Sequence, residues 1–164
     1  MKVCILGDGL TSLALAKALI NKGIGVDILA NNNKNNKKNK IRTIGISKSN
    51  IDFFNKNILN IEKLLWDINK IEIYSESSLN EEILNFNNKN QKLFSIVKNY
   101  KLKDYLSSNL KKNKLINFKK KIDLDLIKED YKLIVNCDQS NVFTKKFFYK
   151  KINKNYHSNA YVTV

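Results

Sequence analysis

The first thirty residues contain three segments whose apolar side chains recur at different spacings. Residues 2–6 form a short apolar run, residues 13–20 carry apolar side chains at helical spacing, and residues 26–29 form a second apolar run. A short run bounded by turn residues is typical of a buried strand, and spacing by three and four residues is typical of a helix. The order therefore predicts a strand, a helix and a second strand.

Glycines mark the turn between the first strand and the helix. Gly7 permits a tight turn, and Gly9 lets the backbone come close to a ligand. The N-terminus of the following helix has unpaired N–H groups, which favour the pyrophosphate of a dinucleotide. We therefore predict the opening unit of a dinucleotide-binding fold, although a βα turn can use glycine without any ligand. The residues expected around the pyrophosphate are Gly7, Gly9, Leu10 and Ser12.

Two positions depart from the dinucleotide-binding pattern. Ser12 replaces a third glycine, which normally allows the helix to pack closely on the strand. Ala30 ends the second strand, where an acidic residue usually binds the ribose hydroxyls. Asp27 comes three residues earlier, and its side chain should face the opposite side from Ile28. Because Ala30 offers no carboxylate, the ribose half of the site is damaged. We expect Asn31 to bind the ribose as a neutral substitute.

The rest of the chain alternates between short strand and helix patterns. Residues 31–40 contain no apolar side chain and predict a mobile, low-complexity loop. Ser47 or Ser49 should cap a helix that begins near residue 50. Further segments are predicted as extended at 41–47, 71–74, 83–86, 94–97, 115–118, 122–126 and 131–138, as helical at 100–110 and around 143–149, and as helical or turn at 64–66.

The strand pattern at 131–138 ends in an acidic residue, Asp138. In doubly wound sheets, ligands bind beyond the carboxyl ends of the strands. We expect this strand to lie beside the first one, which would bring Asp138 and Gly7 to the same edge. The segments 71–74 and 83–86 predict an antiparallel pair.

Lysine dominates the charge of the chain. Its 164 residues include 30 Lys and Arg against 15 Asp and Glu, for a net charge of +15. Arg42 is the only arginine, whereas nucleic-acid-binding proteins use arginine for base edges and bidentate phosphate contacts. We therefore interpret the charge as compositional drift and expect no specific nucleic-acid site. A nonspecific, salt-sensitive attraction to polyanions is still expected.

The remaining composition indicates a single domain, residues 1–164, in the cytoplasm. No apolar stretch is long enough to span a membrane, and no signal peptide precedes the first strand. Cys4 and Cys137 lie in strand-like runs and are expected to be buried free thiols. His157, the only histidine, is expected at the surface. The pattern contains no metal-ligand cluster and no catalytic triad.

Five segments along the chain carry a family resemblance. They are VCILGDGLTSLALAKAL, RTIGIS, IEIYSESS with ILNF, LFSIVKNYKLKDYL and YKLIVNCDQSN. In this order they resemble the N-terminal part of the ubiquinone-biosynthesis flavin hydroxylases, the UbiH/UbiF/VisC branch of the FAD-dependent aromatic monooxygenases. The resemblance implies an α/β, Rossmann-like FAD-binding fold with an inserted small antiparallel strand pair, truncated at the C-terminus. It also implies that Arg42 lies near the flavin and that Asp138 matches the family's aspartate.

The resemblance implies an activity as well. The family uses FAD, with NAD(P)H as reductant, to hydroxylate the aromatic ring of a polyprenyl-phenol substrate. Expected partners are a complementary chain, other ubiquinone-biosynthesis proteins and, peripherally, a membrane. Gln139 and Val142 depart from the family pattern, and Val164 falls on a truncation point relative to longer family members. The alternative is a non-catalytic remnant or nucleotide-binding module, and no catalytic residue can be named.

Overall fold

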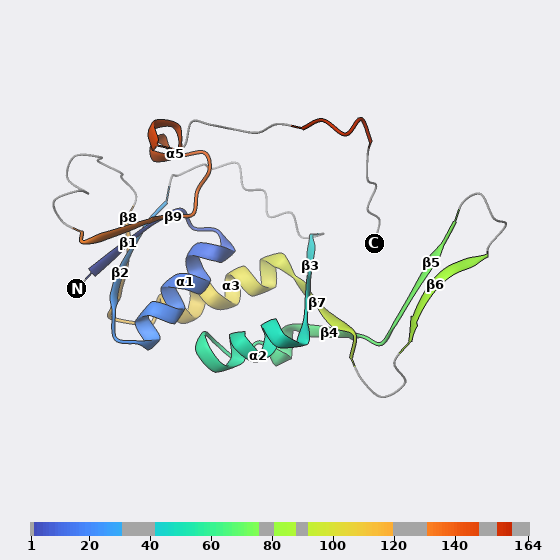
Figure 1. Ribbon diagram of the computed structural model, residues 1–164. Helices are drawn as coiled ribbons and strands as arrows, with labels where there is room; N and C mark the ends of the chain where they lie inside the picture. Colours follow the sequence, from blue (N-terminus) through green and yellow to red (C-terminus); the bar gives the residue numbers. More distant parts are fainter. Residues whose placement is uncertain are drawn as a thin grey trace. The chain divides into compact units, whose positions relative to one another are not determined.

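A computed structural model describes residues 2–30, 42–75, 81–87, 92–119, 131–147 and 154–158. The chain divides into two compact units, one made of residues 1–36 and 110–164 and the other of residues 37–109. Each unit is described by itself below (Figure 1). The predicted loop at 31–40, with Asn31, and the predicted strand at 122–126 lie outside the described residues.

The first unit is built on a parallel sheet of four strands. These are β1 (Lys2–Leu6), β2 (Gly25–Leu29), β8 (Ile116–Lys119) and β9 (Leu133–Asn136), in the order β8-β2-β1-β9. Val3 pairs with Leu133, and Leu6 with Asn136. The predicted placement of the last strand beside the first is therefore confirmed. The strand is shorter than the predicted 131–138, because its pairing with β1 stops at the end of β1.

Helix α1 (Leu10–Asn21) connects β1 to β2 and covers one face of this sheet. Its buried apolar residues Leu13, Ala16 and Ile20 recur at helical spacing. The helix ends at Asn21, and Gly23, just beyond it, has a φ of 75° in the left-handed region. The Gly23 and Ile24 N–H groups donate to the last carbonyls of the helix, which completes a Schellman end.

The opposite face of the sheet holds a second apolar cluster. It is formed by Cys4, Leu6, Leu29, Tyr131 and Phe143, with Ile134 packed against it. Phe143 belongs to a short helix, α5 (Val142–Phe147). Both faces of the parallel sheet are thus covered, as expected for strands of this kind.

A buried carboxylate, Asp27, lies within this second face. Its side chain is fully buried, and four side chains from neighbouring segments converge on it. The Lys2 and Lys119 ammonium groups lie 2.8 and 2.9 Å from its oxygens, and the Asn117 amide donates at 3.1 Å. The Tyr131 hydroxyl donates a further hydrogen bond. One carboxylate on β2 therefore ties together β1, β8 and the segment that enters β9.

These contacts set the protonation states around Asp27. Burial alone would raise the pKa of Asp27, but the hydrogen bonds from the four converging side chains outweigh it and hold this pKa well below its usual range. Cys4 is the register partner of Asp27 on β1. Burial and the neighbouring carboxylate raise the pKa of the Cys4 thiol to about 11, so this thiol stays protonated and unreactive at neutral pH.

The second unit contains a three-stranded antiparallel sheet and a separate ribbon. The sheet has the order β3-β7-β4, and the ribbon is formed by β5 and β6. The elements are β3 (Thr43–Ile46), α2 (Lys48–Asn57), a 3₁₀ turn (Glu62–Leu64), β4 (Leu65–Ile68), β5 (Lys70–Tyr74), β6 (Glu82–Asn87), β7 (Phe94–Lys98) and α3 (Asn99–Leu110). The predicted antiparallel strand pair is confirmed by β5 and β6.

Two local predictions in this unit have different outcomes. Ser47 caps α2, since its hydroxyl oxygen accepts from the Asn50 N–H at 3.4 Å. The helical or turn element predicted at 64–66 is correct only as far as Leu64. Leu65 and Trp66 instead begin β4 and pair with β7. Pairing with a strand about thirty residues away overrides the local preference there.

The cysteine and histidine predictions can also be compared with the structure. Cys4 is a buried free thiol, as predicted, but Cys137 lies one residue beyond β9 and is only half-buried. It leaves the core because β9 ends where β1 ends. His157 is exposed, as expected. Among the helices of the described ranges, none has the length and apolar character needed to cross a membrane.

Replacing Asp27 should destabilise the first unit at neutral pH. Asp27→Asn removes the charge that compensates two ammonium groups, and we expect a loss of about 3 kcal/mol in the free energy of unfolding. Because folding lowers the pKa of Asp27, this stabilisation is present above the unfolded-state pKa of about 4 and fades as the pH falls below it.

Urea unfolding at several pH values measures this loss. Asp52→Asn, at an exposed position of α2, is the matched control and should leave the midpoint unchanged. Equal midpoints for the Asp27 and Asp52 variants at pH 7 would contradict the account.

Candidate dinucleotide site

The carboxyl ends of β1 and β9 meet at one edge of the parallel sheet. The Gly7 N–H donates to the Leu29 carbonyl at 2.8 Å, and the Cys137 N–H donates to the Leu6 carbonyl at 3.0 Å. The first bond extends the pairing of β1 with β2 by one residue, and the second extends the pairing of β9 with β1. Gly7 and Asp138 consequently face each other just beyond the sheet.

Gly7 is required at this edge for two reasons. Its φ of 103° lies in the left-handed region, which side chains other than glycine rarely adopt. A Cβ at Gly7 would also lie 3.0 Å from the Asp138 Cβ and 3.4 Å from the Ser12 hydroxyl oxygen. The turn therefore leaves no room for a side chain between β1, α1 and the end of β9.

Gly9 has the opposite surroundings. It is the N-cap of α1, where it supplies no side chain to cap the helix, and the first turn holds no acidic residue. A Cβ at Gly9 would meet no protein atom within 4 Å. The first hydrogen bond of the helix runs from the Leu13 N–H to the Gly9 carbonyl at 3.0 Å. The N–H groups before Leu13 lack intrahelical acceptors, so this end of α1 can accept an anion.

Ser12 lies beneath this turn. Its side chain is fully buried, and its hydroxyl has no hydrogen-bond partner among the described residues. The oxygen points toward Gly7, as the 3.4 Å approach to a Cβ at that position indicates. A buried hydroxyl without a partner destabilises the free chain. Ser12 is thus accommodated at the third glycine position at an energetic cost.

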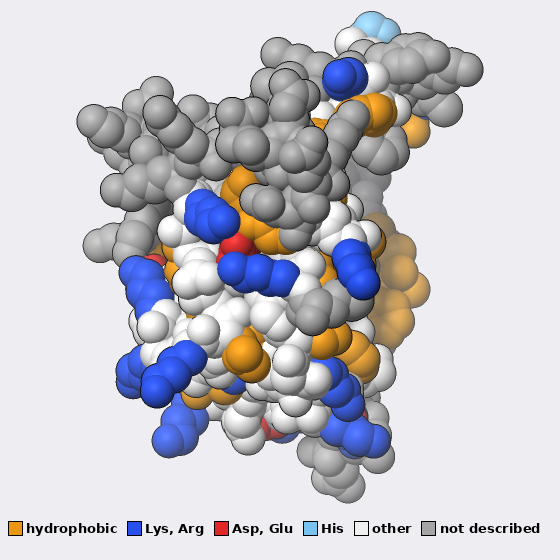
Figure 2. All heavy atoms as spheres, turned by 90° about the vertical axis from the view of Figure 1, so that its left-hand side faces the viewer, with side chains coloured by type: hydrophobic (Ala, Val, Ile, Leu, Met, Phe, Trp, Pro, Cys, Tyr) orange, Lys and Arg blue, Asp and Glu red, His pale blue; other side chains and the backbone are white. Residues whose placement is uncertain are grey.

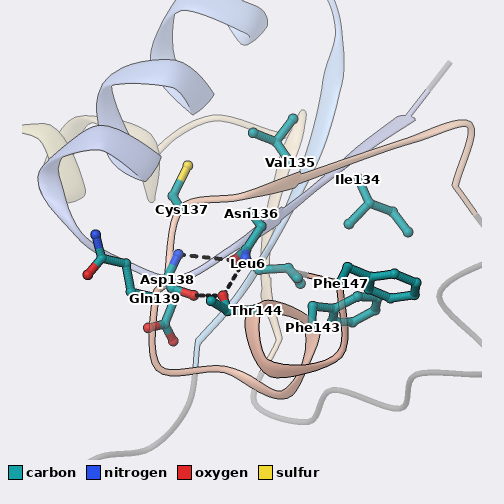
Figure 3. Close-up of a pocket in the computed structure, with 10 residues that line it drawn as sticks. All are labelled: Leu6, Ile134, Val135, Asn136, Cys137, Asp138, Gln139, Phe143, Thr144 and Phe147. Carbon is teal, nitrogen blue, oxygen red and sulfur yellow. Dashed lines mark hydrogen bonds between the residues drawn. The ribbon is translucent and has the colours of Figure 1, made fainter. Parts of the chain in front are cut away.

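Asp138 organises the loop after β9 (Figure 3). One oxygen of its carboxylate accepts the Ser140 N–H at 2.9 Å and the Ser140 hydroxyl at 2.7 Å. Its N–H donates to the Asn136 side chain at 3.1 Å, and its carbonyl accepts the Thr144 hydroxyl at 2.8 Å. Asp138 therefore holds the backbone that faces Gly7.

A pair of asparagines, which the sequence patterns did not single out, supports the same loop. Asn141 is buried; its side-chain oxygen accepts the Thr144 N–H at 2.9 Å, and its amide donates to Asn136. Asn136 in turn donates to the Thr144 hydroxyl at 2.7 Å. The only signal in the sequence is the mostly polar run at 136–141 before a short helix.

A cavity of about 880 Å³ opens beside this loop. Figure 3 shows the Phe143 and Phe147 rings together on one side, with Asp138 and Gln139 on the other. The two rings are stacked with their centroids 6.0 Å apart. The cavity is lined by Leu6, Ile134, Val135, Asn136, Cys137, Asp138, Gln139, Phe143, Thr144 and Phe147. It joins an apolar wall to the polar strand ends, which suits a ligand that is partly apolar.

The predicted site residues fall into three groups. Gly7, Gly9, Leu10, Ser12 and Asp138 come together at the edge just described. Asn31 lies outside the described residues. Arg42 belongs to the other unit, where it is exposed and its carbonyl accepts the Asn99 N–H at 3.0 Å.

At the end of β2, Ala30 provides no hydrogen-bonding group for a ribose. The Ala30 N–H is taken by the Lys119 carbonyl at 3.2 Å, and its side chain has no polar atom. Asp8 lies exposed between the two glycines. Its negative charge beside a helix N-terminus would weaken the binding of an anionic ligand. The residues present fit a pyrophosphate better than a ribose.

Comparison with solved structures identifies the fold. p-Nitrophenol 4-monooxygenase PnpA from Pseudomonas putida DLL-E4 matches 71% of the chain with a TM-score of 0.58 and 13% identity. PqsL from P. aeruginosa, in complex with 2-aminobenzoylacetate, matches 72% with a TM-score of 0.59 and 14% identity. HpxO from Klebsiella pneumoniae, complexed with FAD and uric acid, matches 76% with a TM-score of 0.53 and 16% identity. The fold is that of the FAD-binding part of flavoprotein monooxygenases.

The predicted α/β fold class is thereby confirmed. The chain spans about a third of the length of these monooxygenase structures, 31%, 32% and 33% respectively. No family model matches the sequence. Among curated proteins, too, no significant match is found.

Removing the Ser12 hydroxyl should stabilise the free chain. Ser12→Ala deletes a buried hydroxyl that has no partner in the described part of the chain, and we expect a gain of about 1 kcal/mol in the free energy of unfolding. Ser12→Gly should gain less, since glycine costs about 1 kcal/mol relative to alanine in a helix. Thermal unfolding of both variants measures the difference. A loss of stability in Ser12→Ala would show that the hydroxyl is hydrogen-bonded.

Proposed function

We propose that this chain is the FAD-binding portion of an FAD-dependent monooxygenase. The observation that carries the proposal is the N-terminus of α1, where the N-cap Gly9 supplies no side chain, behind the turn from Gly7 to Gly9 at the edge shared by β1 and β9. The FAD pyrophosphate would bind the N–H groups of the first helical turn. The bound flavin supplies the redox chemistry, and the residues of this chain bind and orient it.

The structural neighbours and the fit of the site support this proposal. HpxO, whose FAD-binding part has this fold, forms a complex with FAD and uric acid. The cavity beside Asp138 could receive an apolar part of the cofactor. We propose that the Asn31 side chain, in place of a carboxylate, hydrogen-bonds the ribose hydroxyls, because Ala30 provides no hydrogen-bonding side chain. Weakened binding of the adenosine half is the expected consequence.

We also propose the ubiquinone branch of these enzymes. The support is the ordered resemblance of five segments, from the glycine turn to Asp138. In this proposal NAD(P)H is the reductant, a polyprenyl-phenol is hydroxylated on its aromatic ring, and Arg42 lies near the flavin. A substrate of that kind would favour peripheral membrane contact from a cytoplasmic protein. The partners that this proposal implies are a complementary chain and other ubiquinone-biosynthesis proteins.

A second candidate is a non-catalytic remnant or nucleotide-binding module. Ala30, which provides no carboxylate for the ribose, favours it. It differs from the first proposal in turnover, and both proposals allow binding through the glycine turn. A specific nucleic-acid function is not proposed, because lysines are spread over the face in Figure 2, separated by other polar and apolar side chains.

Flavin fluorescence during titration with the chain tests FAD binding. We expect quenching with a dissociation constant in the micromolar range or below. Gly9→Val should fold normally, because a Cβ at Gly9 meets no protein atom, but it should weaken binding at least about tenfold by blocking the pyrophosphate. Ser108→Val, at an exposed position of α3, is the matched control.

Three outcomes of the titration are distinct. Binding that Gly9→Val weakens and Ser108→Val does not supports the site. Equal affinity of the unaltered chain, Gly9→Val and Ser108→Val for FAD would mean that FAD does not bind at the glycine turn. Absence of binding by the unaltered chain would mean that the fold is kept without the cofactor.

A further inference from the structure

The two sides of the carboxyl end of β2 differ in charge. In the order β8-β2-β1-β9, this strand lies between β8 and β1. The β1 side holds the glycine turn with Asp8. On the β8 side, Lys119 is the register partner of Leu29 and the last residue of its strand. The ribose of a dinucleotide whose pyrophosphate binds the turn would lie at this end of β2. The carboxylate therefore lies on the pyrophosphate side and the lysine on the far side of β2.

The carboxylate that usually ends the second strand is missing. Residues 30–40 contain no Asp or Glu. A carboxylate there would accept hydrogen bonds from the ribose hydroxyls and would repel a phosphate on the 2′ oxygen. Ala30 has neither effect, because its side chain is a methyl group and its N–H is taken by the Lys119 carbonyl at 3.2 Å. Sites that take a 2′-phosphate instead have a basic side chain near the ribose.

Lys119 provides a basic side chain beside Ala30. Its side chain is 48% exposed, so its ammonium group is accessible to a ligand. The ammonium group donates to the Tyr131 hydroxyl at 3.0 Å and lies 2.9 Å from the Asp27 carboxylate. These two contacts hold the pKa of Lys119 above its usual range, so the group stays charged at neutral pH.

Asp27 has enough partners to release Lys119. The Lys2 ammonium group lies 2.8 Å from its carboxylate, the Asn117 amide donates at 3.1 Å, and the Tyr131 hydroxyl also donates. Two ammonium groups therefore share one buried carboxylate, which leaves one positive charge uncompensated. The flexible lysine stem allows Lys119 to turn toward an anion at the strand end, while Asp27 keeps three partners.

We infer that the ribose end of this site selects a 2′-phosphorylated adenine dinucleotide, the NADP(H) class, over its unphosphorylated counterpart. Lys119 would bind the 2′-phosphate through a charge-assisted hydrogen bond, and Ala30 leaves that phosphate without a repelling carboxylate. The inference rests on the proposed function in its use of the glycine turn. It concerns the ribose end alone, so the affinity for FAD is measured separately.

Isothermal titration calorimetry with NADPH and with NADH tests the inference, because these two nucleotides differ only in the 2′-phosphate. At about 0.15 M salt, where exposed charges are partly screened, we expect NADPH to bind at least about tenfold more tightly than NADH. A chain with a net charge of +15 also attracts any polyanion. Variants are therefore needed to separate the site from the net charge.

Ala30→Glu restores the carboxylate and should act in opposite directions on the two nucleotides. We expect at least about tenfold weaker binding of NADPH, through repulsion of its 2′-phosphate, and tighter binding of NADH through its ribose hydroxyls. Ala30→Gln has the same size without the charge and should leave NADPH binding strong. Ser108→Glu, at an exposed position of α3, gives the same net charge as Ala30→Glu and is the matched control.

Lys119→Met tests the basic side chain. Binding of NADPH should weaken about tenfold, while binding of NADH should stay unchanged. Lys114→Met removes the same charge at an exposed position just before β8, at the other end of that strand, and is the control. Circular dichroism checks that every variant folds.

The outcomes distinguish the inference from the proposed function. A preference for NADPH that Ala30→Glu abolishes and Ser108→Glu does not supports the inference. Equal affinities for NADPH and NADH, an equal response to both Glu variants, or no binding of NADPH would overturn it. FAD binding without a preference for NADPH would overturn the inference alone. A preference for NADPH without FAD binding would overturn the proposed function alone.

Discussion

The close approach of Gly7 to Asp138 is the constraint on which the candidate site depends. A Cβ at Gly7 would come within 3.0 Å of the Asp138 Cβ, so the ends of β1 and β9 can meet only where β1 is followed by glycine. This contact places the N-terminus of α1 against the loop after β9. The open space at Gly9 and the cavity beside Asp138 lie at this same edge.

The parts of the fold that could be predicted are those with a local signal. The glycines between an apolar run and a helical pattern identified the βα turn and its open position at Gly9. Alternation over 71–74 and 83–86 identified the ribbon, because a polar turn separates two short apolar patterns. The neighbourhood of β1 and β9 followed from a general property of doubly wound sheets, combined with the acidic residue at the end of a buried strand.

The parts that could not be predicted depend on residues far apart in the sequence. Asp27 looked like a misplaced polar residue, yet it is the buried centre of contacts from Lys2, Asn117 and Tyr131. No local spacing relates these positions, since their meeting requires the strand order β8-β2-β1-β9. The same reason explains β4, whose pairing with β7 has no local signal. Sequence and structure together thus support the pyrophosphate half of the site more strongly than the ribose half.

The amide NMR spectrum of the isotope-labelled chain, recorded as FAD is added, tests the central claim most directly. If the pyrophosphate binds the N-terminus of α1, the largest shifts should fall on the N–H groups of Gly9, Leu10 and Thr11, with smaller shifts at Gly7 and Asp138. Residues at the far end of α1 should stay unchanged. Shifts that are absent from the glycine turn while FAD is bound would contradict the account.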